Sequence, residues 1–192
     1  MKYSILAAAV LLFAVSCKKE DKPTPATVAT FDFVVNGSPT QGNYDFFSFA
    51  TGAKVAATDS NSTKWDFAMR FETFIINSNA SGPGNAGVQI VNTPFDNVTA
   101  APETGYKYDT TVSQKAIKGS DWYVYAGRSF SPIAGKTFVF RTATNKFAKL
   151  EVISADALDA SGNILSPTSP VRPASIKYKI RFAYQPGGKR DF

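Results

Sequence analysis

The sequence predicts a mainly β protein, a single domain of packed antiparallel sheets with little helix. Aromatic residues make up 14% of the 192 residues, with 16 Phe, 8 Tyr and 2 Trp. Short stretches of alternating apolar and polar residues recur along the chain, separated by turns rich in Gly, Pro and Asn. Aromatic and β-branched residues in such alternation are typical of strands, and no long segment has a helical period.

The chain begins with a predicted lipoprotein signal peptide, residues 1–16. Lys2 is followed by an unbroken apolar run from Ile5 to Val15, which is too short to span a bilayer. The run ends at Ala14-Val15-Ser16-Cys17, which resembles a bacterial lipobox, so Cys17 is predicted to be the lipidated first residue of the mature chain. The alternative is an ordinary signal peptide in which the single cysteine is incidental.

A polar, Pro- and Thr-rich linker, residues 17–30, is expected to follow the lipidated cysteine. Its run Lys18-Lys19-Glu20-Asp21-Lys22 is similar to the short charged signal that sends some lipoproteins to the outer face of the outer membrane. The alternative is a merely solvated tether. The sequence therefore predicts a lipid-anchored protein of the outer membrane, exposed on the cell surface.

Residues 31–192 have the length of one ordinary domain. The formal net charge of the chain is +6, and removal of residues 1–16 takes away only Lys2, leaving +5. The positive charges are dispersed, so we expect no nucleic-acid partner. The chain has no histidine and one cysteine, which excludes Ser/His/Asp and Cys/His nucleophilic sites and imidazole metal sites. We expect a protein that is not an enzyme.

The first predicted strands lie in the N-terminal third of the domain. Phe31–Val35 ends at the turn-forming residues 36–39, and residues 44–49 form a hairpin with residues 54–57. Strict alternation over Trp65–Glu72 predicts one core face, with Trp65, Phe67, Met69 and Phe71, and one wetter face. Met69 is the only methionine of the mature chain, and its aromatic neighbours favour core packing over metal ligation.

A glycine-rich loop is predicted from Asn77 to Val88. Gly82, Gly84 and Gly87 are expected to allow positive φ angles. Backbone amides in such a loop can bind an anion, but no lysine follows at phosphate-loop spacing, and a structural role is favoured.

Further strands are predicted in the C-terminal half. They are residues 121–125, a hairpin of residues 136–142 with 146–153, and a last strand over Ser175–Gln185. Lys and Arg at outward positions of these strands are expected to keep an exposed sheet soluble. Residues 156–159 are expected to form one helical turn.

Four blocks in this order resemble the HmuY family of haem-binding surface lipoproteins. They are Trp65-Asp66-x-Ala68-x-Arg70; Asn79 with Ser81-Gly82-x-Gly84-x-x-Gly87; Phe140-Arg141-Thr142 with Lys146-Phe147-Ala148-Lys149-Leu150; and Phe182-x-Tyr184-Gln185-Pro186-x-Gly188. The resemblance implies an HmuY-like fold of antiparallel strands and a role in haem binding and iron acquisition. It also implies host haemoproteins and an outer-membrane receptor as partners.

The haem ligands that the resemblance implies are missing from this chain. Family members hold haem iron with His or Met, one of them just after the strand that corresponds to residues 122–125, where this chain has Ala126-Gly127. The other lies in an upstream loop, here shortened to residues 112–120, which also lacks His and Met. A tyrosine phenolate can hold haem iron, so Tyr123 and Tyr125 are the candidate ligands. The alternative is that both are core or stacking residues.

Two functions therefore remain open. One is a haem carrier that binds through an aromatic surface and a single tyrosine. The other is a non-haem surface protein that stacks a glycan or binds a partner protein on an exposed surface of residues 122–125. A purely structural envelope lipoprotein is a third alternative.

Overall fold

The computed structural model describes residues 26–126 and 129–192, and this part of the chain is built almost entirely of strands. Eleven strands and three single 3-10 turns are present, with no α-helix among the described residues. The strands are β1 (Thr27–Asn36), β2 (Asp45–Ser48), β3 (Ala53–Val55), β4 (Phe67–Arg70), β5 (Thr73–Ile76), β6 (Gly87–Val91), β7 (Tyr123–Ala126), β8 (Ser129–Pro132), β9 (Thr137–Arg141), β10 (Phe147–Leu158) and β11 (Ser175–Gln185). The predicted mainly β fold is confirmed.

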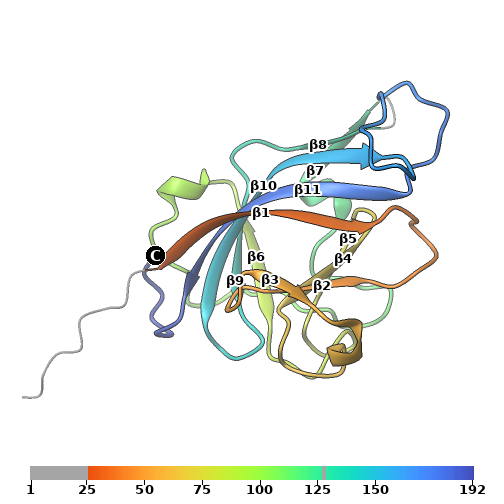
Figure 1. Ribbon diagram of the computed structural model, residues 1–192. Helices are drawn as coiled ribbons and strands as arrows, with labels where there is room; N and C mark the ends of the chain where they lie inside the picture. Colours follow the sequence, from red (N-terminus) through yellow and green to blue (C-terminus); the bar gives the residue numbers. More distant parts are fainter. Residues whose placement is uncertain (1–25, 127–128) are drawn as a thin grey trace, which may run out of the picture.

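The largest sheet has five antiparallel strands in the order β1-β11-β10-β9-β6. Strand β1 pairs with β11 over its whole length, from Thr27 opposite Tyr184 to Asn36 opposite Ser175. The two ends of this ladder are about 30 Å apart, at roughly 3.3 Å per residue. Figure 1 shows β1, β10 and β11 crossing the molecule side by side, with the C-terminus beside the start of β1.

A second sheet, in the order β3-β2-β4-β5, packs against the first, and the hairpin β7–β8 lies at one end (Figure 1). Phenylalanine rings fill the space between the two sheets. Phe33 of β1 contacts Phe47 and Phe67 with ring centroids 5.7 Å apart in both pairs, and Phe47 lies 5.4 Å from Phe182 of β11. Burial of these large rings provides most of the driving force that holds the sheets together.

The segment Trp65–Glu72 differs from its predicted alternation. Phe67 and Met69 are fully buried in the main core, as expected. Trp65 instead packs with Ala68 and Phe46 in a smaller cluster on the opposite face of the second sheet, so this face is also covered. The strand ends at Arg70 because Phe71 takes a positive φ of 51° and turns the chain into β5.

Other segments also depart from the prediction. Strands β5, β6 and β8 occupy residues that were not predicted as strands. Residues 156–158 continue β10 instead of forming a helical turn, because they pair with β11 up to Leu158 opposite Ser175. Strand β1 begins at Thr27, so its first four residues belong to the segment that the sequence assigned to the linker.

The glycine-rich loop is tight for a reason other than the predicted one. Gly82, Gly84 and Gly87 do not have positive φ angles, whereas Asn79 does, at 45°. A Cβ atom on Gly82 would lie 2.3 Å from Asn77 Oδ1 and 2.6 Å from Trp65 Cζ2. Close packing rather than backbone conformation therefore requires these glycines: Gly82 and Gly84 lie against Asn77, and Gly87 lies against the rings of Tyr106 and Tyr108.

Lys149 of β10 is an exception to the predicted solvent exposure of basic residues. Its side chain is buried and its ammonium group donates hydrogen bonds to the carbonyl oxygens of Phe95 (2.8 Å) and Val98 (2.7 Å). It also lies 4.4 Å from the centre of the Phe95 ring. Lys149 thus ties the 3-10 turn Phe95–Asn97 to the five-stranded sheet.

Candidate functional site

The two tyrosines that the sequence singled out lie on the same face of β7. Residues two apart on a strand point to the same side, and both rings pack on Phe130 of β8 with centroids 5.0 Å apart. They differ in exposure, because Tyr125 is 58% exposed and Tyr123 is half-buried. Only Tyr125 therefore presents most of its ring to solvent.

Tyr123 is directed towards the core. Its ring contacts Trp122 with centroids 4.7 Å apart. Burial raises the pKa of the Tyr123 phenol, and the nearby Glu72 carboxylate and Tyr125 add to the shift. A raised pKa makes the phenolate harder to form, so Tyr123 is the less suitable anionic ligand.

Tyr125 lies in a cleft of about 410 Å³, which we call the Tyr125 cleft. Its walls come from the β1–β2 connection, the β4–β5 turn, the β7–β8 hairpin, the end of β10 and the loop between β10 and β11. The lining residues are mostly apolar: Gly37, Pro39, Phe71, Tyr125, Phe130, Ala157, Leu165, Ser166, Ser169, Pro170, Val171, Arg172 and Pro173. The volume lies within the range of about 300–1,000 Å³ that is usual for small-molecule sites.

Phe71 forms part of the cleft wall because its backbone is fixed in a left-handed conformation. The Phe71 amide donates to the Asn36 carbonyl at 2.7 Å, and the Tyr178 hydroxyl donates to the Phe71 carbonyl at 2.7 Å. The ring then packs edge-on against Phe130, with centroids 5.0 Å apart. These contacts fix the two rings that form the base of the cleft.

The loop of residues 159–174 forms the outer wall. It is closed by backbone hydrogen bonds from Leu165 to Ala157 and from Ala174 to Leu158, both at 2.8 Å. It contributes Arg172, the one charged side chain among the described residues of the cleft lining. Arg172 is exposed and makes no hydrogen bond or ion pair within the described chain, so its guanidinium is available to an anionic group.

The other positions that the sequence considered lie away from this cleft. Met69 is fully buried in the main core. Trp122, predicted on an exposed stacking surface, is 1% exposed because its ring packs edge-on against Phe74, 5.5 Å between centroids. Ala126 is exposed at the end of β7, Gly127 lies outside the described residues, and no residue of the loop 112–120 lines the cleft.

Among the described residues, no group of three or more His, Cys, Asp or Glu side chains could hold a metal ion. The same residues include no helix that is long and apolar enough to cross a membrane. Cys17 and the predicted signal peptide lie outside the described residues. Among its described residues, the Tyr125 cleft offers one phenol oxygen, a set of apolar rings and one free guanidinium.

Comparison with known families gives one match, to the family described as HmuY protein, over residues 40–165. The chain belongs to the HmuY family. The matched range covers well over half of the chain and includes β2 to β10, together with Tyr123, Tyr125 and Phe130. No curated protein sequence matches the chain.

One solved structure of an HmuY analogue shares the fold, and two other structures resemble the chain less closely. The apo form of an HmuY analogue from Tannerella forsythia is 13% identical, with a TM-score of 0.53, over 86% of this chain and all of that one. A Bacteroides vulgatus protein provisionally assigned as HmuY-like and haem-binding is 16% identical (TM-score 0.44, covering 81% and 92% of the two chains). A Bacteroides fragilis protein provisionally assigned as a lipoprotein is 14% identical (TM-score 0.41, 79% and 88%). At these identities the Tannerella structure supports the HmuY-like fold alone.

Proposed function

We propose that this protein is a surface-anchored lipoprotein that binds haem in the Tyr125 cleft. The observation that carries the proposal is an exposed tyrosine beside an apolar cleft whose rim holds an unpaired arginine. Membership of the HmuY family supports haem as the ligand. Cys17 as the lipid anchor, the outer membrane as its location, and host haemoproteins and an outer-membrane receptor as partners belong to the same proposal.

Each part of the cleft matches one part of the haem molecule. The Tyr125 phenol makes no hydrogen bond to any described residue, so its oxygen is available to coordinate ferric iron as a phenolate. The rings of Phe71 and Phe130 and the side chain of Leu165 provide an apolar surface for the porphyrin. The Arg172 guanidinium can pair with a propionate carboxylate.

A titration of the purified protein with ferric haem, followed by visible absorbance, tests this proposal. A single tyrosinate gives a high-spin complex, and we expect this spectrum to saturate and to be lost in Tyr125→Phe. Tyr123→Phe is the matched control. It also removes a tyrosine hydroxyl from this face of β7, but Tyr123 does not line the cleft, so this variant should retain the complex.

Two results would contradict the proposal. Absence of a saturable spectral change would favour the non-haem alternative, a glycan or protein ligand. A low-spin spectrum that survives Tyr125→Phe but disappears in Met69→Ala would mean that the core rearranges to provide a different ligand.

A further inference from the structure

A second cavity, of about 570 Å³, lies at the opposite end of the β1–β11 ladder from the Tyr125 cleft. Tyr184, which lines it, is opposite Thr27 at the start of β1, whereas Gly37 and Pro39 of the Tyr125 cleft follow the end of β1. The other walls come from the end of β2, the β2–β3 turn, the 3-10 turn Ala57–Asp59 and the β9–β10 turn. We call this cavity the polar groove.

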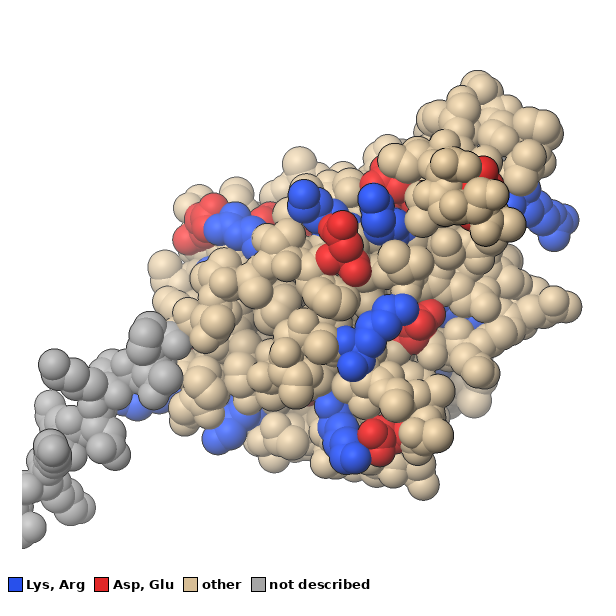
Figure 2. Space-filling model, viewed as in Figure 1, with Lys and Arg blue, Asp and Glu red and all other residues tan. Residues whose placement is uncertain are grey.

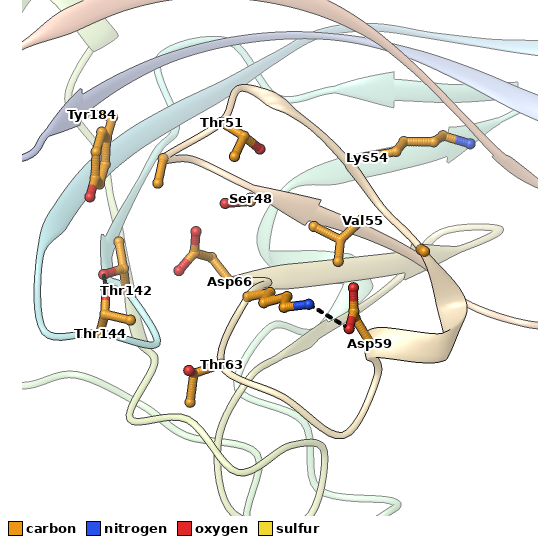
Figure 3. A pocket seen from close by; sticks show the side chains of 13 residues that line it. Ser48, Thr51, Lys54, Val55, Asp59, Thr63, Asp66, Thr142, Thr144 and Tyr184 are labelled. Carbon is orange, nitrogen blue, oxygen red and sulfur yellow. Dashed lines mark hydrogen bonds and ion pairs between the residues drawn. The ribbon is translucent and has the colours of Figure 1, made fainter.

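Hydroxyl and carboxylate groups converge in the polar groove. Figure 3 shows the side-chain oxygens of Ser48, Asp66, Thr142 and Tyr184 around a common space. Ser48 points into this space because its neighbours Phe47 and Phe49 alternate with it and face the core. Most residues that line the groove carry a polar side chain, whereas most residues that line the Tyr125 cleft are apolar in type.

Two of these oxygens have no hydrogen-bond partner among the residues that the structure describes. Ser48 is 3% exposed, yet its hydroxyl makes no hydrogen bond with the described part of the chain. The hydroxyl of the half-buried Tyr184 also makes none with the described residues. Neither oxygen is among the buried unpaired side-chain atoms of the described residues, so both reach solvent and are available to a ligand that brings its own donors and acceptors.

Asp66 is held rigidly as an acceptor on the groove floor. Its Oδ2 accepts the Phe49 amide at 2.8 Å and its Oδ1 accepts the Ala143 amide at 3.0 Å. Each carboxylate oxygen can accept more than one hydrogen bond, so acceptor capacity remains for a ligand hydroxyl. The same bonds join the end of β2 to the β9–β10 turn, which fixes the shape of the groove.

The charges at the rim of the groove do not attract an anionic ligand. Lys54 is paired with Asp45 at 2.8 Å, and Lys64 with Asp59 at 2.9 Å. Figure 2 shows the same interleaving of basic and acidic side chains over this face of the molecule, without a patch of one sign. With the lysines paired and a carboxyl group on the floor, the groove favours a neutral ligand.

We propose that the polar groove is a carbohydrate-binding site for a neutral oligosaccharide. Sugar hydroxyls both donate and accept, which matches Asp66 as an acceptor and Ser48 and Tyr184 as unpaired hydroxyls. The Tyr184 ring provides an aromatic wall on which the apolar face of a sugar ring can stack. This site is separate from the haem site and does not depend on it.

The test measures binding of neutral hexose and N-acetylhexosamine oligosaccharides to the purified protein by calorimetry and saturation-transfer NMR. We expect saturable binding of at least one neutral oligosaccharide, weakened about three- to tenfold by Tyr184→Phe and by Ser48→Ala, since each loses about one hydrogen bond. Both variants should keep the melting temperature of the parent, because neither hydroxyl has a partner within the described chain. Tyr125→Phe, a Tyr-to-Phe change in the other cavity, is the control and should leave sugar binding unchanged.

Three outcomes would overturn the proposal: no saturable binding across the neutral panel, binding that both groove variants leave unchanged, or tighter binding of sulfated or sialylated sugars than of their neutral counterparts.

Haem binding serves as a separate readout. Tyr184→Phe should leave the haem titration unchanged, so failure at one site is distinguishable from failure at the other.

Discussion

At the scale of a single residue, two effects shift the pKa of Asp66 in opposite directions: burial raises it, and hydrogen bonds from backbone amides lower it. Its two amide hydrogen bonds stabilise the carboxylate, but burial favours the neutral acid by more. Burial therefore raises the pKa of Asp66 from 3.8 to about 6. In the unfolded chain the carboxyl returns to its ordinary pKa, so the folded state binds the proton more tightly than the unfolded state does.

This difference predicts a pH-dependent stability. The contribution of Asp66 to the free energy of unfolding should be largest below pH 4 and should be lost as the pH rises through 6, by up to about 3 kcal/mol. Denaturant unfolding of the parent and of Asp66→Asn across this range isolates the effect, because other carboxyl groups titrate equally in both. The stability advantage of the parent over the variant should grow as the pH falls, and a constant difference would contradict the assigned pKa.

Arg172 allows a second test at the residue scale. Arg172→Gln removes a charge from the Tyr125 cleft lining and should weaken ferric haem binding about two- to fivefold, as expected for an exposed ion pair. Haem dimethyl ester has no propionate charge, and its affinity should not change. Lys179→Gln, which removes an exposed charge from β11 outside the cleft, is the control. Equal losses for haem and its ester would mean that Arg172 does not bind the propionates.

At the scale of elements, substitutions at two glycines can show whether close packing or backbone conformation makes a glycine necessary. Asn tolerates positive φ but needs space, so Gly82→Asn should cost roughly 1–3 kcal/mol, because its Cβ meets Asn77 and Trp65. Gly162 has a φ of 84° with open space around it, and Gly162→Asn should cost less, at most about 1 kcal/mol, because Asn tolerates positive φ better than other residues with a side chain. Chemical denaturation measures both, and equal costs would refute the packing explanation.

The elements that the sequence predicted best are those with period-two alternation and a clear turn. The hairpin of β9 and β10 is confirmed, as is β11, because their inward residues form one face of the core. Strand β5 was missed because residues 74–76 are apolar and buried without alternation. Residues 156–158 were misassigned because their strand state depends on pairing with β11, which local sequence does not encode.

The residues of the candidate sites could likewise be predicted only in part from the sequence. Tyr125 was identified from its position on a predicted strand, but Arg172 and Leu165 join it only through the loop between β10 and β11. Ser48 carried no signal in the sequence, because a serine between two phenylalanines is ordinary in a strand. Its significance depends on Asp66 and Tyr184, which lie far from Ser48 in the sequence.

At the scale of the whole molecule, the two cavities lie at opposite ends of the long β1–β11 ladder. The predicted linker leads into β1 at Thr27, beside Tyr184 of the polar groove. A protein anchored through Cys17 would be tethered at the end of the ladder that carries the polar groove, and the Tyr125 cleft lies at the other end, about 30 Å away along the strands.

The predicted anchor is tested by changing Cys17. The acyl chains supply the membrane affinity, so Cys17→Ala should move the protein to the soluble fraction or leave its signal peptide uncleaved. Replacing Lys18–Lys22 with alanines is the matched change, because it keeps the lipidated residue. That variant should stay in the membrane fraction but become protected from protease added to intact cells, if the charged run directs surface export. A Cys17→Ala protein that is still processed and membrane-bound would show that the apolar start of the chain is an ordinary signal peptide and that another contact holds the protein to the membrane.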